Sequence, residues 1–440
     1  MKILKIVIVL IFISNQVYGQ KKKITKEERL EWFKDAKLGI FIHWGIYAVN
    51  GIDESWSFYN NYISHFDYMK QLDGFTARKY NPEYWAELIK ESGAKYTVIT
   101  AKHHDGVALW NTKQNDLSVV KKAKAKRDLI TPFVNAVRKE NLKVGLYFSL
   151  LDWSYPDYPN FLRDKKRYIK DKKRWKNFTK FNFGQIEELT KFNPDLYWFD
   201  GDWEQSAEQW KALEIRDLLL EKTPTTIINS RLQGYGDYAT PEQGVPIQKP
   251  SNNYWELCMT MNNSWGYQPN DNKYKSTNQL IRILVDCISM GGNLLLDIGP
   301  KADGTIPKEQ VKILKGIGKW TSKHKEAIYG TRAGIPHKYF NGYTALSKDK
   351  KIVYLYVDNK PNGPLLIKGL KNKVNRIWVV GNGTKLPYNV VGKSYWSTVP
   401  GLLYIDVPEE VQDKDVTVIA ILLDGEIDLY SGESKKIENN

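Results

Sequence analysis

The sequence predicts an α/β protein: a (β/α)8-like TIM barrel catalytic domain followed by a C-terminal antiparallel β-sandwich. Between Leu38 and Tyr329, short apolar runs rich in β-branched residues alternate with longer segments of helical period. No Gly-rich nucleotide-binding loop follows any of these runs, which favours a closed barrel over an open sheet. After about His337, short strand-like runs are joined by turns such as Asn382-Gly383, with no helical segment between them.

Six runs in the first region are typical of buried parallel strands: Leu38 to His43, Tyr96 to Ala101, Lys143 to Ser149, Asp195 to Asp200, Thr225 to Asn229 and Asn293 to Ile298. Helices are expected between them. Asn81 can cap a helix, Pro82 suits its first turn, and Gly93 ends it. Ser276 with Gln279 forms a capping box before a second amphipathic segment. This alternation predicts parallel β/α units.

The second region has the pattern of an all-β domain. Its expected strands are Lys351 to Asp358, Leu365 to Leu370, Arg376 to Val380, Leu402 to Val407 and Thr417 to Leu423. We therefore expect a signal peptide at residues 1–19, the barrel at 20–336, the sandwich at 337–430 and a frayed tail at 431–440.

The N-terminus has the pattern of a secretory signal peptide. Lys2 and Lys5 precede the apolar stretch Ile6 to Ile13, and small residues lead to Gly19. The apolar stretch is too short to span a bilayer, and no other stretch approaches that length. We expect a secreted or periplasmic protein without stable membrane insertion.

Composition excludes some classes of protein. Two cysteines, Cys258 and Cys287, cannot form a disulfide framework, and two buried free thiols are favoured over one bridge. The formal charge of +15 collects in runs such as Lys121 to Arg127 and Arg163 to Arg174. An exported protein seldom meets nucleic acid, so these runs indicate a solvated face or, as the alternative, an anionic substrate such as a sulfated polysaccharide.

Polar side chains gather where the expected barrel strands end, and the active site of such a barrel lies at those ends. The titratable ones there are His43, Lys102, His103, His104, Asp105, Tyr147, Asp152, Asp200, Asp202, Arg231, Asp237 and Glu242. Paired carboxylates among aromatic residues are typical of glycoside hydrolysis, in which one carboxylate faces the anomeric carbon and another carboxyl protonates the leaving oxygen. Asp200 fits the first role because Gly201 leaves the backbone room for a close approach; the alternative is a structural aspartate.

The three histidines have two interpretations. As neutral imidazoles, each offers a donor and an acceptor to sugar hydroxyls, or serves as a buried structural residue. Together with Asp200, they are also a candidate site for a divalent metal that activates water. Adjacent histidines on a strand point to opposite faces unless a bulge intervenes, and no HxH or HExxH spacing occurs. A site without metal or other cofactor is therefore favoured.

Six ordered motifs resemble the α-L-fucosidases of glycoside hydrolase family 29. They are Trp32 to Gly45, Ala101 to Gly106, Trp198 to Gly201, Trp255 to Cys258, Ser264 to Tyr267, and Gly291 to Pro300. The resemblance spans Trp32 to Tyr329. It implies an exo-acting, retaining α-L-fucosidase that works by double displacement through a covalent fucosyl-enzyme, without a metal. Its partner would be a fucosylated oligosaccharide or polysaccharide.

The resemblance also implies roles for single residues. Asp200 stands at the nucleophile position, and Glu242, eleven positions after Arg231, stands at the acid/base position with Glu256 as the alternative. The implied substrate-binding residues are His43, Trp56, His103, His104, Tyr147, Trp198, Arg231 and Trp265. Ser55 separates Glu54 from Trp56, where the family often has an adjacent Glu-Trp pair, so only Trp56 is carried over.

Two alternative functions stay open at this point. L-Galactose differs from L-fucose only by a hydroxyl on C6, so an α-L-galactosidase of the same fold is one. A catalytically inactive carbohydrate-binding relative is the other, which intact Asp200 disfavours. The sequence also leaves a homo-oligomer open.

Overall fold

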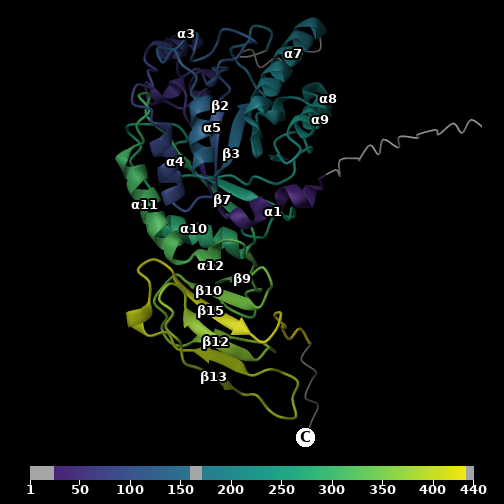
Figure 1. Ribbon diagram of the computed structural model, residues 1–440, viewed down its shortest axis with the longest axis vertical. Coiled ribbons are helices and arrows are strands. Elements are labelled where there is room, and N and C mark those ends of the chain that lie inside the picture. Colours follow the sequence, from purple (N-terminus) through teal and green to yellow (C-terminus); the bar gives the residue numbers. More distant parts are fainter. Residues whose placement is uncertain (1–23, 159–170, 433–440) are drawn as a thin grey trace, which may run out of the picture.

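The computed structural model describes residues 24–158 and 171–432 of the chain (Figure 1). The expected signal peptide at 1–19 lies outside the described residues. So do residues 163–170 of one basic run and residues 433–440 of the expected tail.

The N-terminal region contains a curled sheet of seven parallel strands in the order β5-β4-β3-β2-β1-β7-β6. Their bounds are β1 Leu38–Ile42, β2 Tyr96–Lys102, β3 Lys143–Ser149, β4 Leu196–Asp200, β5 Ile227–Ile228, β6 Glu256–Thr260 and β7 Asn293–Ile298. The predicted barrel class is confirmed. All six expected strands are present, although β5 is much shorter than expected, and β6 was not predicted from the sequence.

An extended segment, residues 237–243, fills the gap between the edge strands β5 and β6. On one side the Asp237 amide donates to the Ile228 carbonyl at 2.6 Å. On the other, the amides of Glu256 and Cys258 donate to this segment, each at 3.0 Å. We call residues 237–243 the closing segment, because it continues the parallel pairing from β5 to β6.

The helices of this region are α1 Lys26–Ala36, α2 Trp56–Tyr59, α3 His65–Met69, α4 Pro82–Glu91, α5 Ile130–Lys139, α7 Lys172–Leu189, α8 Ala207–Trp210, α9 Ala212–Lys222, α10 Thr277–Ser289, α11 Lys308–Lys323 and α12 Lys325–Ile328. Short 3-10 helices are η1 Ile46–Ala48, η2 Lys70–Asp73, η3 Thr190–Phe192, η4 Asp202–Glu204 and, in the C-terminal region, η5 Glu409–Val411. The predicted caps are confirmed: Asn81 accepts from the Tyr84 amide at 2.9 Å, and Ser276 forms the capping box with Gln279.

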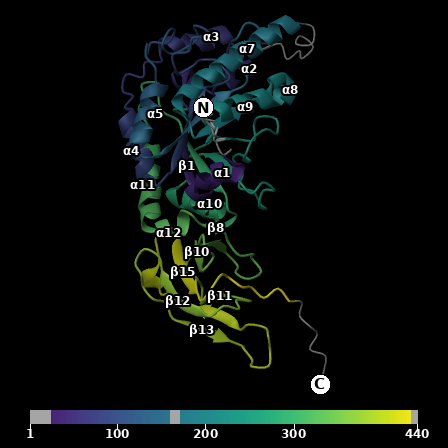
Figure 2. The ribbon, with the colours of Figure 1, turned by 45° about the vertical axis from the view of Figure 1, so that its right-hand side comes forward.

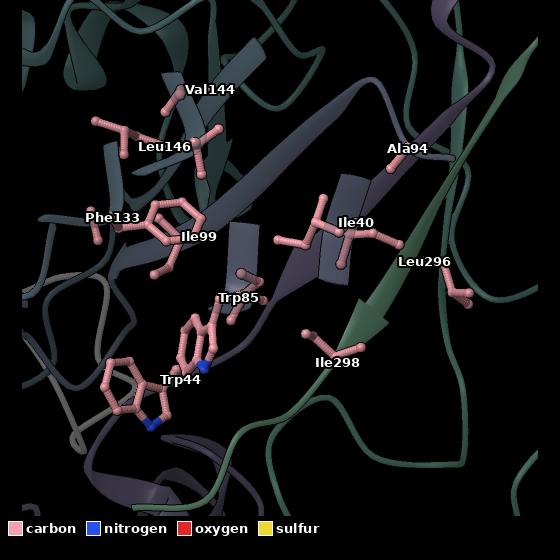
Figure 3. Packing of buried hydrophobic residues seen from close by; sticks show 14 of the residues in the cluster. Ile40, Trp44, Trp85, Ala94, Ile99, Phe133, Val144, Leu146, Leu296 and Ile298 are labelled. Atoms are coloured by element: carbon pink, nitrogen blue, oxygen red, sulfur yellow. The ribbon is translucent and has the colours of Figure 1, made fainter. Parts of the chain in front are cut away.

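Strand residues alternate between two buried layers, as the period of a β-strand requires. Ile40 and Ile42 of β1 face the outer layer, where Trp85 of α4 and Phe133 of α5 pack against the sheet (Figure 3). Phe41, between them in sequence, belongs to the inner layer inside the barrel. Tyr147 of β3 and Trp198 of β4 share this inner layer. The same alternation directs His43, two residues after Phe41, and Asp200, two after Trp198, to the inside.

The C-terminal region consists of two antiparallel sheets, with strand orders β12-β15-β10-β9-β8 and β11-β14-β13. The strands are β8 Arg332–Ala333, β9 Tyr343–Leu346, β10 Ile352–Val357, β11 Leu365–Ile367, β12 Val374–Val379, β13 Tyr388–Val391, β14 Leu402–Ile405 and β15 Thr417–Leu423. The predicted β-rich class is confirmed. β8 precedes the boundary expected after residue 336, and β8, β9 and β13 were not expected.

The β region lies at the end of the barrel that is next to α10 and α12, opposite α2 and α3 (Figures 1 and 2). Trp320 of α11 donates through its indole nitrogen to the Val416 carbonyl at 2.9 Å, and Arg282 pairs with Asp358 at 2.6 Å. These contacts fix the β region away from the carboxyl ends of the barrel strands.

Two further expectations concern the chain as a whole. Cys258 and Cys287 are both free and buried, which confirms the prediction of two buried free thiols. Among the helices of residues 24–158 and 171–432, none is long and apolar enough to cross a membrane.

Candidate active site

A cavity of about 320 Å³ opens at the carboxyl ends of the barrel strands. Its lining residues are Phe41, His43, Glu54, Trp56, His103, Tyr147, Trp198, Asp200, Trp203, Arg231, Glu242 and Trp265. Of the residues proposed from sequence, His104 and Glu256 are outside this lining. Phe41, Glu54 and Trp203 line the cavity although the sequence analysis did not propose them.

A larger surface cavity of about 900 Å³ lies between α11 and the C-terminal region. Lysines form much of its wall, and two of its carboxylates, Glu91 and Asp413, are paired with Lys315 and Lys323. Because two of its three carboxylates are paired with lysines in this way and no histidine lines it, we place the candidate active site in the smaller cavity.

Asp200 ends β4 and accepts hydrogen bonds from two side chains. Tyr147 donates its hydroxyl to Oδ2 at 3.0 Å, and Arg231 donates from Nη1 to Oδ1 at 2.9 Å. His104 Nε2 lies 3.6 Å from Oδ2, beyond hydrogen-bonding distance. Burial raises the pKa of Tyr147 well above its ordinary value, so this hydroxyl keeps its proton and remains a donor. The Asp200 carboxylate is therefore fixed in orientation.

Arg231 binds a second carboxylate through its other terminal nitrogen. Nη2 donates to Glu242 Oε2 at 2.6 Å, and the guanidinium lies over the Trp198 ring at 4.5 Å from its centroid. Burial alone would lower the pKa of Arg231, but nearby negative charges, Asp200 foremost, raise it. One cation thus joins the two carboxylates of the cavity.

Glu242 lies on the closing segment, whose start is fixed by Asp237. The carboxylate of Asp237 is buried and forms ion pairs with Arg29 of α1 at 2.7 Å and with Arg216 of α9 at 3.1 Å. Burial would raise the pKa of Asp237, but the hydrogen bond from Arg29, the nearby charges and Arg216 lower it overall. Asp237 therefore serves as an anchor of the segment and not as a cavity residue.

Glu256 lies beneath the cavity. Its carboxyl is fully buried on β6 and accepts hydrogen bonds from the Trp198 indole nitrogen at 2.9 Å and from the Tyr96 hydroxyl at 2.5 Å. Burial raises the pKa of Glu256 to about 7. This geometry suits a group that orients Trp198, because the indole ring lies between the carboxyl and the cavity.

Each of the three histidines is bonded through Nδ1: His43 to Asp297 at 2.7 Å, His103 to Ser55 at 2.6 Å, and His104 to Ser149 at 2.5 Å. Burial lowers the pKa of all three, that of His104 to about 3, so the rings are neutral. A register shift in the pairing of β2 and β3, between Thr100 and Lys102, accompanies the close approach of the adjacent rings of His103 and His104, whose centroids are 4.3 Å apart.

The metal interpretation requires several of these nitrogen and oxygen atoms to converge. In the described parts of the chain, no group of three or more His, Cys, Asp or Glu side chains is arranged to hold a metal ion. The Nδ1 atoms are instead directed to hydroxyl and carboxyl partners, which orients the rings.

Glu54 reaches the cavity from a loop, and Trp203 reaches it from η4. The Gly266 amide donates to Glu54 Oε1 at 2.5 Å, and burial raises the pKa of Glu54 to about 7. Trp56 lines the cavity as well, so the intervening Ser55 does not displace either residue of the pair. Phe41 could have been found from its strand alternation with His43, whereas Trp203 follows no periodic pattern.

Comparisons with known proteins agree on one family. The sequence model of the alpha-L-fucosidase family matches residues 10–326. The chain is 31% identical over 415 residues to the tissue α-L-fucosidase of Bos taurus, covering 86% of each protein. Among solved structures, α-L-fucosidase isoenzyme 1 from Paenibacillus thiaminolyticus is similar, with a TM-score of 0.81, 32% identity, and coverage of 90% of this chain and 99% of that chain.

A second structural relative bears on mechanism. It is a family 29 α-L-fucosidase from Bacteroides thetaiotaomicron, trapped as a covalent intermediate with 2-fluoro-fucosyl fluoride through a Glu-to-Gln variant. Its TM-score is 0.79 at 28% identity, and the match covers 90% of this chain and 96% of that chain.

Proposed function

The chain belongs to the α-L-fucosidase family, glycoside hydrolase family 29, and on this premise we propose that its cavity hydrolyses terminal α-L-fucosyl linkages in glycans with retention of configuration. The observation that carries the proposal is the pair of carboxylates, Asp200 and Glu242, bonded to one guanidinium at the cavity wall. Two carboxyl groups at one sugar-sized cavity are what double displacement requires.

In the first step, Asp200 attacks the anomeric carbon and the glycosidic C–O bond breaks. Glu242 gives its proton to the leaving oxygen, so the leaving group departs as an alcohol and an ester to Asp200 forms. The bonds from Tyr147 and Arg231 support this role, because they hold the carboxylate in one orientation. The covalent intermediate of the Bacteroides relative supports the same route.

In the second step, water attacks the anomeric carbon of the ester. Glu242, now ionised, takes a proton from the water, and the bond to Asp200 breaks to release L-fucose. Two inversions at the anomeric carbon give net retention. The exposure of the Glu242 side chain, 40%, supports the acid/base role, since that group must meet both the leaving alcohol and the incoming water.

The remaining cavity residues would bind the sugar. We assign the neutral rings of His43 and His103 to its hydroxyls, because a neutral imidazole provides a donor and an acceptor. Their Nδ1 bonds leave Nε2 for substrate. Phe41, Trp198 and Trp265 offer apolar faces that suit the C6 methyl of L-fucose. His104 does not line the cavity, and its Nε2 lies 3.6 Å from Asp200, so it would affect the reaction through Asp200.

Export and an anionic glycan belong to the proposal as well. The basic and then apolar N-terminus supports export by a signal peptide. The formal charge of +15 supports attraction to acidic, for example sulfated, glycans, since net charge of this size steers oppositely charged partners.

The test uses a nitrophenyl α-L-fucoside with wild type, Asp200→Ala and Glu242→Ala, each with and without azide. We expect turnover by wild type and a loss of at least about 10³-fold for Asp200→Ala. Azide should restore Glu242→Ala and yield fucosyl azide of retained configuration, because azide needs no general base to attack the ester. No activity of wild type, or no effect of azide on Glu242→Ala, would contradict the assignment; in the second case Glu256→Ala is tested in its place.

A further inference from the structure

Most of the side chains that line the cavity are buried or half-buried. Of the lining residues, all of which the structure describes, Trp203 and Glu242 are the exposed ones, with 48% of Trp203 and 40% of the Glu242 side chain accessible. The residues deeper in the cavity, such as Phe41, His43 and Trp198, are buried. The entrance therefore runs between an indole ring and the proposed acid/base.

Trp203 is held on a rigid turn. It lies in η4, three residues after Asp200, and the turn starts at Gly201 with φ +81°. A Cβ at Gly201 would lie 2.4 Å from Leu151, so glycine is required there. The Asp202 carbonyl on one side of Trp203 accepts from the Trp210 indole at 2.9 Å, and Glu204 on the other accepts from the Tyr158 hydroxyl at 2.5 Å.

The indole ring of Trp203 is also oriented by Trp56, a neighbouring residue in the cavity wall. The indoles of Trp203 and Trp56 are nearly parallel, at 16°, with centroids 6.2 Å apart. His104 meets the Trp203 ring edge-on at 5.9 Å. Despite these contacts almost half of Trp203 is exposed, although burial of an aromatic side chain is favourable. An exposed indole, fixed on both flanks and beside the nucleophile, is arranged to receive a ligand.

We propose that Trp203 is the platform for the leaving-group sugar, a hexopyranose whose C–H face packs on the indole while its glycosidic oxygen faces Glu242. The inference rests on the proposed function. It follows from the position of the entrance: a fucosyl unit fills the closed part, and whatever it is attached to must lie between Glu242 and Trp203. In a glycan that unit is a pyranose, and aromatic faces bind the apolar faces of such rings.

The experiment compares two substrates that share the fucosyl group. α-L-Fucosyl fluoride has no sugar in its leaving group, whereas an α-L-fucosyl-galactose disaccharide has one. The quantity measured is the ratio of kcat/KM for the disaccharide to kcat/KM for the fluoride. We expect Trp203→Ala to lower this ratio about tenfold or more, and Trp203→Tyr, which retains a ring, to recover much of it.

Trp396→Ala is the matched control. Trp396 is a tryptophan with 69% exposure in the C-terminal region, and its removal should leave the ratio unchanged. A ratio within about twofold of wild type for Trp203→Ala overturns the proposal. So does an equal loss on both substrates, which would make Trp203 a support of Asp200. If wild type does not hydrolyse the fluoride, the proposed function itself fails, which is a separate result.

Discussion

Glu242 accepts a 2.6 Å hydrogen bond from Nη2 of Arg231. The same guanidinium binds Asp200 through Nη1 at 2.9 Å, so the position of each carboxylate depends on the other through one planar group. Lysine cannot reproduce this, because an ammonium is a point charge without two fixed donor directions. The planarity of Arg231 therefore matters as much as its charge.

We expect Arg231→Lys to reduce kcat/KM on a nitrophenyl fucoside by roughly 10- to 100-fold, since hydrogen bonds to charged groups contribute about 1.5–3 kcal/mol. Arg282→Lys is the control, because its ion pair with Asp358 joins the two regions far from the cavity. Steady-state kinetics of both variants decides the point. Equal activities of the two would show that positive charge alone suffices at position 231.

We expect the buried carboxyl of Glu256 to make the free energy of unfolding depend on pH. Its pKa is 4.5 when unfolded and about 7 when folded, owing to burial. Between these values the folded state binds more protons, so the free energy of unfolding falls as pH rises from 4.5 to 7. Glu256→Gln should remove on the order of 3 kcal/mol of this fall, leaving the contributions of other buried carboxyls with raised pKa values, such as Glu54 and Asp105.

Urea denaturation at several pH values measures this fall. Glu221→Gln, at a side chain that is 74% exposed, provides the control. If Glu256→Gln shows the same pH dependence as wild type, the buried carboxyl is not the cause. The fucosidase activity of Glu256→Gln should also survive, in contrast to Glu242→Gln, because Glu256 lies beneath Trp198 and outside the cavity.

His43 and Asp297 form a buried pair at 2.7 Å. Burial lowers the pKa of His43 well below its ordinary value and raises that of Asp297 well above its ordinary value, so both groups favour their neutral forms. A protonated Asp297 would donate to Nδ1, and asparagine can donate in the same place. We expect Asp297→Asn to keep kcat/KM within about threefold and Asp297→Leu to lose tenfold or more. A large loss in Asp297→Asn would instead indicate an ionised Asp297.

Gly106 has φ +78°, and a Cβ there would lie 2.2 Å from Asp152 Oδ1. Asp152 is fully buried and is the partner of Lys102 at 3.5 Å. Gly106→Ala should lower the free energy of unfolding by at least about 2 kcal/mol, from strain plus overpacking. Gly383 has nearly the same φ, +77°, but a Cβ there would meet no neighbouring atom within 4 Å. Gly383→Ala therefore measures the cost of the backbone conformation without the steric clash. Equal losses in denaturant unfolding would refute the steric argument.

Much of the fold followed from the sequence because buried parallel strands are continuous apolar runs. β6 was not predicted because the charged residue Glu256 interrupts its apolar run. The Glu256 carboxyl can be buried because Trp198 and Tyr96, which are distant in sequence, donate hydrogen bonds to it. The closing segment was not predicted as a strand because it contains Pro241. In the structure it pairs with its neighbours only through isolated bridges.

The residues of the candidate site also fall into two groups, those that could be predicted from the sequence and those that could not. Residues that end strands, such as His43 and Asp200, were proposed from sequence because alternation and strand direction place them. Trp203 was missed because its position depends on a turn fixed by Trp210 and Tyr158 through contacts that no local pattern encodes.

The closing segment connects catalysis to the place where β5 and β6 are joined. Next to β5 it is held by one backbone hydrogen bond, from Asp237 to Ile228, together with the side-chain bonds of Asp237. Opening on the β5 side would let this segment, still bonded to β6, move Glu242 away from Asp200 while the helices and the other strands stay folded. Heat would then inactivate the enzyme below its melting temperature, and cooling would restore it. A cross-link between the closing segment and β5 would therefore raise the working temperature by more than it raises the temperature of global unfolding.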